Sequence, residues 1–290
     1  MSQQIRQITQ KSPDFPKILL EIPHPPKTLN VWGKVPKTEH YISIVGARKN
    51  SAYGEEILRK IISGLAPHGF TIISGLAVGI DSVAHKAALE NNMPTIGILG
   101  SGLQKNVFFP FQNWKLAENI VSAGGAVISE YENDMKAAYW SFPQRNRIIS
   151  GLSKATLIVE AGEKSGSLIT ARFALDQNRE VMAVPGMVYS ANSKGTNRLI
   201  KQGAHLIESA EDVLEIYGIN FTKQPSCLVT EQLGCLTPQE KIIFDTINEP
   251  ADIDTIIRAC KMPSYEVQAV IGLMELRGII KKVGNEYIKS

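Results

Sequence analysis

Two glycine-rich turns follow consecutive apolar segments near the start of the chain. The first, residues 46–54, follows the apolar segment 41–45, and the second, residues 74–81, follows the segment 70–73. Glycine lets a backbone approach a ligand closely, and a helix that begins after such a turn offers N–H groups with partial positive charge to a phosphate. Because a single dinucleotide normally uses one such turn, the doubling indicates a ligand with several phosphates. Nucleic acid is the first candidate.

The first turn also carries Arg48. Its planar guanidinium can hold a phosphate, or the edge of a guanine, through two parallel hydrogen bonds. The alternative for either turn is that its glycines only serve a tight connection between a strand and a helix.

The composition is that of an ordinary globular protein. The 290 residues include 43% hydrophobic and 20% charged residues, and this length favours about two domains. No apolar run approaches the roughly 20 residues that a membrane span requires, and the first residues lack the layout of a signal peptide. Cys227, Cys235 and Cys260 form no CxxC pair. We therefore expect reduced cysteines, a cytoplasmic location, and neither a metal site nor a cofactor.

The charge is distributed unevenly along the chain. Residues 230–290 contain seven Lys/Arg and nine Asp/Glu, a net charge of −2, whereas the whole chain carries +3, which leaves +5 for residues 1–229. A total of +3 is too small to argue for nucleic-acid binding by itself. If a polyanion binds, the N-terminal part is favoured over the tail.

Short apolar segments alternate with longer amphipathic segments between about residues 41 and 217. This alternation is typical of right-handed βαβ units and predicts an α/β fold: an extended Rossmann-like, doubly wound, mostly parallel sheet covered by helices on both faces. Ligands of such sheets bind outside the carboxyl ends of the strands, where both glycine-rich turns lie. The expected strands are residues 41–45, 70–73, 94–99, 126–129, 155–160 and 181–184, and the expected helices include residues 55–65, 82–90 and 168–177.

The chain divides into four predicted parts. A Pro-rich start is expected to be extended and to pack on the next domain through Leu29, Val31 and Trp32, and a polar, less periodic stretch is expected to be a linker. The predicted parts are an extended N-terminal segment (residues 1–40), a Rossmann-like DNA-binding domain (41–219), a linker (220–230) and a small C-terminal winged-helix domain (231–290).

The tail shows three short helical patterns followed by a hairpin, the order of a winged helix-turn-helix module. Thr237 is the expected N-cap of the first helix, Pro238 its first residue, and Gly284 and Asn285 the turn of the hairpin. Winged helices often bind duplex DNA, but a net charge of −2 argues against a strong hold on phosphates. We therefore favour a protein-contact or regulatory role for the tail.

Further polar motifs fall at the same predicted edge of the sheet. Arg145 and Arg147 stand at the start of a predicted helix, before the strand 155–160, and a Gly/Ser-rich turn, residues 161–167, follows that strand. Because carboxyl ends of parallel strands meet at one edge, these turns are expected to form a basic groove lined by helix N-termini.

Taken together and in this order, the motifs resemble those of the DprA/Smf family of DNA-processing proteins. The resemblance covers residues from about 20 to 215, and the tail is similar to the winged-helix domain of the family. Six motifs in one register carry it: Arg48-x-x-Ser51-x-Tyr53-Gly54, Ser74-Gly-Leu-Ala-x-Gly-Ile-Asp81, Phe142-Pro-x-Arg-Asn-Arg-Ile, Ser165-Gly-Ser-Leu-Ile-Thr170, Val184-Pro-Gly186 and Gly195-Thr-Asn-x-Leu-Ile-x-x-Gly-Ala204.

The resemblance implies a non-enzymatic protein, usually a homodimer, that binds single-stranded DNA. It also implies that the protein protects incoming DNA during natural transformation and helps to load the RecA recombinase. Phe142 is then expected to stack on a base. Carried onto this chain, the DNA-binding residues are Arg48, Ser51, Ser74, Gly75, Gly79, Phe142, Arg145, Asn146, Arg147, Lys164, Ser165, Gly166 and Ser167.

Each of these residues also has a structural alternative. Phe142 could fill the core under its helix, and the three arginines could lie on a solvated face. Glu160, at the end of a strand, is interpreted as a residue that organises neighbouring loops rather than one that performs chemistry.

Other residues near the motifs are interpreted as structural. These are the aromatic residues Phe109, Tyr139 and Trp140. Asp81 and His85 stand four residues apart on one predicted helix, where they could pair, and we expect a hydrogen bond that locks the fold rather than an acid–base role.

Two classes of enzyme are the alternatives. A nicotinamide-dependent dehydrogenase needs an acidic residue about 20 residues beyond its glycine turn, but the second strand ends in Ile73-Ser74-Gly75. Nucleotide phosphoribohydrolases share a similar fold, but their Pro-Gly-Gly-x-Gly-Thr signature is poorly matched at Pro185. A P-loop is absent too, since Lys164-Ser165 lacks the preceding glycine. A nucleotide-processing enzyme of the phosphoribohydrolase type is therefore the second interpretation.

Overall fold

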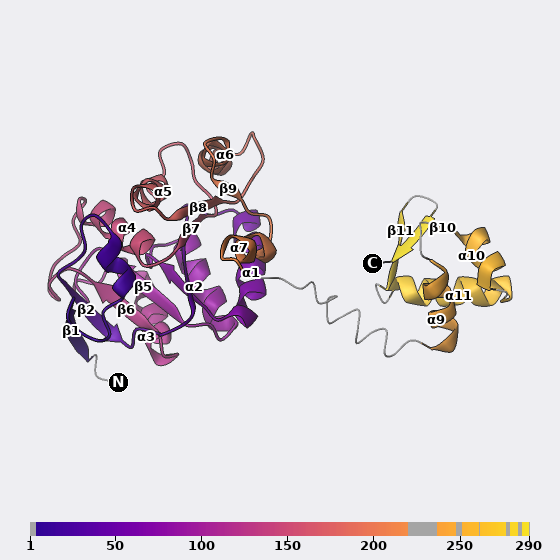
Figure 1. Ribbon diagram of the computed structural model, residues 1–290, viewed down its shortest axis with the longest axis horizontal. Helices are drawn as coiled ribbons and strands as arrows, with labels where there is room; N and C mark the ends of the chain where they lie inside the picture. The colour runs from indigo at the N-terminus through magenta and orange to yellow at the C-terminus, as the bar shows by residue number, and fades with distance from the viewer. Residues whose placement is uncertain are drawn as a thin grey trace. The chain divides into compact units, whose positions relative to one another are not determined.

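The computed structural model shows two compact units, residues 1–220 and 221–290 (Figure 1). It describes residues 4–219, 237–247, 251–260, 262–276, 279–283 and 286–289. The predicted linker, residues 220–230, and the predicted hairpin turn at Gly284 and Asn285 lie outside the described residues.

A nine-stranded sheet forms the centre of the first unit, in the order β1-β2-β6-β5-β4-β3-β7-β8-β9. Seven adjacent strands run parallel, and most of their side chains are buried on both faces, as expected from continuous apolar runs. The predicted Rossmann-like, mostly parallel sheet is thus confirmed. The parallel strands are β3 (His40–Val45), β4 (Phe70–Ser74), β5 (Thr95–Leu99), β6 (Ala126–Ser129), β7 (Ala155–Ile158), β8 (Glu180–Ala183) and β9 (His205–Leu206).

Helices cover both faces of the sheet (Figure 1). One core cluster joins the sheet to side chains of α1 and α2, such as Leu58 and Ala84, and the other joins it to side chains of α4 and α5, such as Ile148 and Ala171. The first face carries α1 (Ala52–Leu65), α2 (Ile80–Glu90), α3 (Trp114–Ser122) and α7 (Ala210–Ile216), and the second carries α4 (Ser141–Gly151), α5 (Ser167–Asp176) and α6 (Lys194–Lys201). Short 3-10 turns lie at η1 (Lys17–Glu21), η2 (Ala66–His68), η3 (Phe111–Asn113) and η4 (Ala191–Ser193).

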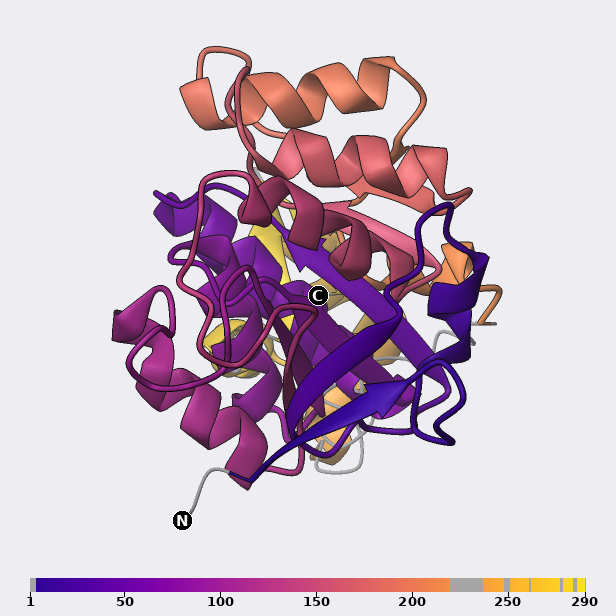
Figure 2. The ribbon, with the colours of Figure 1, turned by 90° about the vertical axis from the view of Figure 1, so that its left-hand side faces the viewer.

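The N-terminal segment, predicted to be extended and to pack on the next domain, contributes two strands to this sheet. Its strands β1 (Ile5–Thr9) and β2 (Thr28–Gly33) run antiparallel to each other, and β2 runs antiparallel to β6. Leu29 and Val31 join the core on one face and Trp32 joins the core on the other, so β2 is buried on both sides. Pairing with β2 also covers the edge of β6, which would otherwise be open to another chain. Figure 2 shows these strands in indigo, toward the viewer.

The strand order places the carboxyl ends of β3 and β7 at a topological switch point. The chain moves outward from β3 through β4 and β5 to β6, and then returns to β7 on the other side of β3. The loops that follow β3 and β7 therefore diverge to opposite faces, which is where doubly wound sheets bind their ligands.

Within residues 237–289, the described parts of the second unit form three helices and a small antiparallel sheet with the order β10-β12-β11. Thr237 caps α9 as predicted, because its Oγ1 accepts from Glu240 N at 3.3 Å while Glu240 Oε2 accepts from Thr237 N at 2.8 Å. Ile243, Ile256 and other apolar side chains form its core. The elements are α9 (Pro238–Thr246), β10 (Ala251–Asp252), α10 (Ile253–Cys260), α11 (Ser264–Leu276), β11 (Ile280–Val283) and β12 (Glu286–Lys289).

Candidate nucleic-acid interface

The turn after β3 closes on a carboxylate of the chain itself. Ser51 is the N-cap of α1, and its Oγ accepts a hydrogen bond from Gly54 N at 3.1 Å. The same hydroxyl donates to Glu160 Oε1 at 2.6 Å, and Ser51 N donates to Glu160 Oε2 at 2.9 Å. Glu160 lies in the loop after β7 and is 3% exposed. The N-terminus of α1 thus holds an internal carboxylate where the sequence predicts a phosphate.

Polar groups of the turn after β4 also form hydrogen bonds within the protein. Gly79 has a φ of +84°, and a Cβ at this position would lie 2.6 Å from the carbonyl oxygen of Arg48, so only glycine lets the two turns lie this close. Ile80 N, at the start of α2, donates to Ala47 O at 3.1 Å. The buried hydroxyl of Ser74 donates to a carbonyl of β3 at 2.7 Å. The glycine-rich turns therefore bring the loops together, and both the Ile80 amide and the Ser74 hydroxyl bond within the protein rather than to a ligand.

Arg145 is a buried brace under these turns. It is 6% exposed, and its Nη1 donates to the carbonyl oxygen of Gly75 at 2.6 Å and to that of Ile98 at the end of β5. Its Nε donates to Asn146 Oδ1 at 3.1 Å. Asp81 Oδ2 accepts from Gly75 N at 3.0 Å, so the guanidinium and this carboxylate hold the same turn from two sides.

Burial sets the charge state of this cluster. Burial lowers the pKa of Arg145 to about 10, and the guanidinium of Arg48 adds to this, while the Asp81 carboxylate opposes it. Burial raises the pKa of Asp81, and the Arg145 guanidinium opposes that shift. The pKa of the buried His85 imidazole falls to about 3, mainly through burial.

The structure gives Asp81 and His85 separate partners, so the pair considered from their spacing does not form. Asp81 binds the Gly75 amide, whereas His85 Nδ1 lies 2.7 Å from Thr95 Oγ1. Because His85 stands on the face of α2 that packs against β5, its ring points at the sheet rather than along the helix. Both groups hold the fold together from buried positions.

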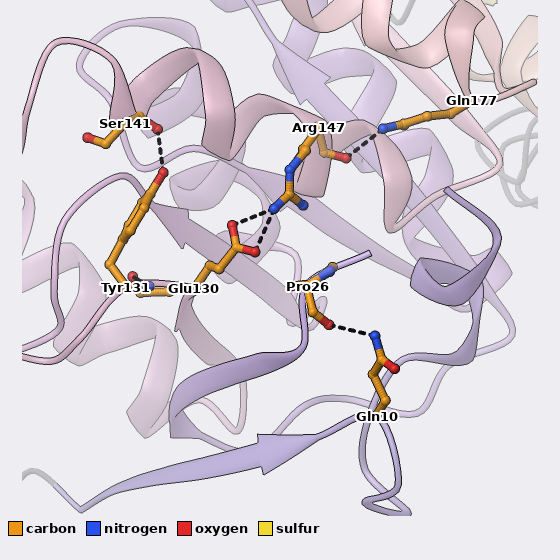
Figure 3. Close-up of polar contacts among 8 residues, drawn as sticks. Gln10, Pro26, Glu130, Tyr131, Ser141, Arg147 and Gln177 are labelled. Carbon is orange, nitrogen blue, oxygen red and sulfur yellow. Dashed lines mark hydrogen bonds and ion pairs between the residues drawn. The ribbon is translucent and has the colours of Figure 1, made fainter. Parts of the chain in front are cut away.

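Arg147 also binds within the protein, through an ion pair with Glu130 (Figure 3). Its Nη2 donates to both carboxylate oxygens of Glu130, at 2.5 and 2.6 Å, and both side chains are largely buried. The Arg147 carbonyl accepts from Gln177 Nε2 at 2.9 Å, and Tyr131 Oη donates to the Ser141 carbonyl at 3.1 Å. These contacts, seen together in Figure 3, fasten the start of α4 to the loop after β6 and to the end of α5.

Arg48, Phe142 and Phe109 form a ladder of side chains at the carboxyl edge. The Arg48 guanidinium carbon lies 5.9 Å from the centroid of the Phe142 ring, and the ring centroids of Phe142 and Phe109 lie 5.5 Å apart. Arg48 is exposed, Phe142 is half-buried and Phe109 is 48% exposed. We call this set the Arg48–Phe142–Phe109 ladder. It combines an exposed cation with one half-buried and one exposed aromatic ring.

The turn before α5 contributes one further exposed cation. Lys164 and Gly166 are exposed, whereas Ser165 Oγ and Ser167 Oγ lie 2.7 Å from each other and bind within the turn. Three of the predicted site residues, Arg48, Lys164 and Gly166, are exposed at this edge. The half-buried ones are Phe142, Ser51, Gly79, Asn146, Arg147 and Ser165, and the buried ones are Ser74, Gly75, Arg145 and Ser167.

Three aromatic residues interpreted as structural from the sequence are instead exposed. Phe109 belongs to the ladder, Tyr139 is 94% exposed and Trp140 is 57% exposed, with the Trp140 ring edge-on to Tyr131 at 5.7 Å. All three lie in the loops after β5 and β6, at the carboxyl edge of the sheet, and this position is the sequence signal that could have predicted their exposure.

Metal ligation and membrane insertion find no support among the described residues. Within residues 4–219 and the described parts of the tail, no three His, Cys, Asp or Glu side chains are grouped as metal ligands require. Across the same residues, no helix combines the length and the apolar character of a membrane span.

The sequence of the chain matches known proteins over most of its length. The family model described as DNA recombination-mediator protein A matches residues 6–218. Protein Smf of Escherichia coli is 39% identical over 95% of this chain and 75% of its own length. DNA processing protein DprA of Bacillus subtilis is 40% identical over 73% of this chain and 71% of its own length.

Two solved structures share the fold of the first unit. DNA processing protein A of Streptococcus pneumoniae has a TM-score of 0.67 and 37% identity, covering 73% of this chain and 74% of that protein. DNA processing protein A of Helicobacter pylori, whose structure is described in terms of its single-stranded DNA binding mode, has a TM-score of 0.66 and 29% identity, covering 74% and 96%. With the family model spanning nearly the whole first unit, the chain belongs to the DNA recombination-mediator protein A family, the DprA/Smf family that its motifs predict.

Proposed function

We propose that this protein binds single-stranded DNA along the carboxyl edge of its large sheet. The observation that carries the proposal is the Arg48–Phe142–Phe109 ladder, which places an exposed guanidinium beside a half-buried and an exposed aromatic ring at the switch-point edge. Unpaired bases expose faces that stack on aromatic rings, whereas the bases of a duplex do not. The solved relative from Helicobacter pylori, which binds single-stranded DNA, supports this assignment.

The charges around the ladder suit a polyanion without sequence preference. Lys49 and Lys164 are exposed in the loops that follow β3 and β7, on either side of the switch point. Phosphate contacts of this kind supply affinity that depends on salt rather than on sequence, and each stacked base adds roughly 1–3 kcal/mol.

The remaining predicted residues act by positioning the ladder. Arg145 fixes the Gly75 turn and the start of α4, which carries Phe142, and Ser51 fixes the turn that carries Arg48 through its bonds to Glu160. Arg147, Ser74 and Gly79 support the same loops. These roles are consistent with DNA binding in which few side chains touch the ligand and many hold the edge rigid.

We further propose a non-catalytic role for the protein. It would protect incoming DNA during natural transformation and help to load RecA, acting in the cytoplasm as a homodimer, with the winged-helix unit as a protein-contact or regulatory module. Membership in the family supports these proposals.

Fluorescence anisotropy of a labelled single strand tests the binding proposal. The wild type should bind the labelled strand tightly. Unlabelled single-stranded DNA should displace that strand, whereas duplex DNA should not. Phe142→Ala should weaken binding about tenfold, as expected for one stacked base. Tyr265→Ala, at an exposed tyrosine of the second unit, is the matched control and should change nothing.

Two results would overturn this function. One is equal competition by duplex DNA. The other is turnover of a nucleoside monophosphate by the purified protein, which would favour the phosphoribohydrolase alternative. RecA loading is measured separately. On a single strand coated with a single-stranded DNA-binding protein, this protein should shorten the lag before RecA hydrolyses ATP, and an unchanged lag would contradict RecA loading.

A further inference from the structure

An exposed apolar turn follows β8 at the same edge of the sheet. Met187, Val188 and Tyr189 are 81%, 72% and 97% exposed, three consecutive large side chains with little protein around them. Soluble proteins rarely leave such a cluster in water unless it contacts a ligand or a partner. We call it the 187–189 turn.

Hydrogen bonds hold the backbone of this turn although its side chains are free. Tyr53 Oη donates to Pro185 O at 2.8 Å, and the side-chain amide of Asn197 binds Gly186 N and Gly186 O at 3.2 and 2.9 Å. Ser190 N donates to Met187 O at 2.9 Å. The turn is therefore a fixed platform, and its side chains can bind without the cost of ordering a loose loop.

The turn is continuous with the loops that carry the cations of the proposed DNA edge. Asn192, three residues after Tyr189, donates from Nδ2 to Lys49 O at 3.0 Å, and Ala161 N donates to Asn192 O at 2.7 Å. Lys164 is exposed in the same loop as Ala161, the loop after β7. The loops after β3, β7 and β8 thus form one connected surface.

We propose that the 187–189 turn is a second stacking site for the same DNA strand, with Tyr189 against one base and Lys49 and Lys164 beside the phosphates between it and the base on Phe142. This inference rests on the proposed function. The strands β5 and β8 stand four strand spacings apart, roughly 19 Å, so one strand of several nucleotides would reach from Phe109 to Tyr189.

Charge favours DNA over a second copy of this chain as the occupant. The exposed charged groups around the turn include Lys49, Lys164, Glu208 and the ion pair of Lys194 with Glu163 at 3.3 Å, while Glu160 is buried against Ser51. The exposed groups named here leave a small excess of positive charge, and it lies on the side of the turn that faces the proposed DNA edge, at Lys49 and Lys164. A second copy would present the same excess and be repelled, whereas a polyanion with stackable bases is attracted.

Strand length gives the decisive experiment. Oligothymidylates of about four and about 16 nucleotides, the range of site sizes for such proteins, are titrated by anisotropy against the full-length wild type, Tyr189→Ala and Tyr189→Phe. We expect Tyr189→Ala to weaken the long strand about tenfold and the short strand hardly at all, and Tyr189→Phe to bind like wild type. Tyr265→Ala is again the matched control, because it is 74% exposed in the other unit.

The outcomes separate this inference from the proposed function. Equal affinity of wild type and Tyr189→Ala at both lengths, with Arg48→Ala still impaired, overturns only the second stacking site. No binding by the wild type overturns the proposed function itself. If sedimentation shows that Tyr189→Ala lowers the association state, the turn is a contact between copies, and the stacking site is also overturned.

Discussion

Arg48 and Arg145 lie in different motifs and have opposite roles. Arg48 is exposed beside the Phe142 ring. Arg145 is buried, and its guanidinium donates hydrogen bonds to the carbonyl oxygens of Gly75 and Ile98. At the scale of single residues, Arg48 is therefore accessible to a phosphate, whereas Arg145 stabilises the loops at the same edge of the sheet.

Removing the exposed arginine should weaken DNA binding without harming the fold. For Arg48→Ala we expect about a tenfold loss of affinity and a salt dependence that is shallower by about one phosphate contact. The measurement is anisotropy of a labelled single strand across a salt series. Lys154→Ala, at an exposed lysine just before β7 and so at the opposite edge of the sheet, should bind like wild type; equal losses in both variants would contradict a defined site.

Removing the buried arginine should instead damage stability. Arg145→Ala leaves two carbonyls and the nearby Asp81 carboxylate uncompensated, which should cost about 3–5 kcal/mol of unfolding free energy. Urea unfolding followed by circular dichroism measures it, with the exposed Arg172→Ala as control. Wild-type stability combined with lost DNA affinity would show that Arg145 touches DNA directly.

At the scale of elements, helix starts and strand ends determine where the ligand edge lies. The N-terminus of α1 is held by Ser51 and Glu160, and that of α2 lies against the Ala47 carbonyl. These elements create the edge, and the amides of Ser51, Gly54 and Ile80 bond within the protein. In the proposed function, DNA is therefore contacted by side chains that project from the turns.

Ser51→Ala should loosen the start of α1. It removes the N-cap, worth about 0.5–2 kcal/mol, and leaves a buried Glu160 oxygen without its hydroxyl partner. Thermal unfolding should show a lower midpoint than for Ser63→Ala, an exposed serine later in the same helix. Matching midpoints in the two variants would mean that the Ser51–Glu160 contact adds nothing to stability.

His85, on α2, should make the stability of the first unit depend on pH. Its pKa falls from an ordinary 6.5 to about 3 in the folded state, so the unfolded chain binds more protons between these values. Stability from the neutral imidazole is therefore complete above pH 6.5 and is lost as the pH falls toward 3. Urea midpoints measured between these limits should fall less steeply for His85→Gln than for wild type; parallel curves would refute the assignment.

The sequence predicted six of the seven parallel strands, β3 to β8, because each is a short apolar run that is mostly buried on both faces. β1 and β2 were not predicted as strands of this sheet, since their pairing depends on the edge of β6, about a hundred residues away. β9 is only two residues long and has no pattern of its own. For the site, the motifs located the correct edge but not the exposure of each residue. Arg145 is buried by carbonyls 70 and 47 residues away, contacts that no local pattern contains.

At the scale of the whole molecule, the proposed DNA-binding edge belongs to the first unit, and the second unit differs from it in charge. The excess positive charge lies in residues 1–229, and the exposed face of α11 presents Tyr265, Gln268, Ala269 and Leu273 without a cation. A recognition helix that binds duplex phosphates normally carries basic side chains, so this face suits a protein better than DNA.

Deleting residues 221–290 should therefore leave single-strand affinity nearly unchanged, within about twofold, because the phosphate contacts remain. Anisotropy on the shortened chain measures this, with circular dichroism as the check that the first unit is folded. A large loss of affinity would place a DNA contact in the second unit.

The most direct test of the account is photocrosslinking of an iodouracil-substituted single strand, followed by mapping of the linked peptides. Iodouracil links efficiently to aromatic rings on which it is stacked, so the account predicts links at Phe142 and Phe109 that Phe142→Leu reduces. Links confined to the amino edge of the sheet or to the second unit would contradict the claim that the Arg48–Phe142–Phe109 ladder binds single-stranded DNA.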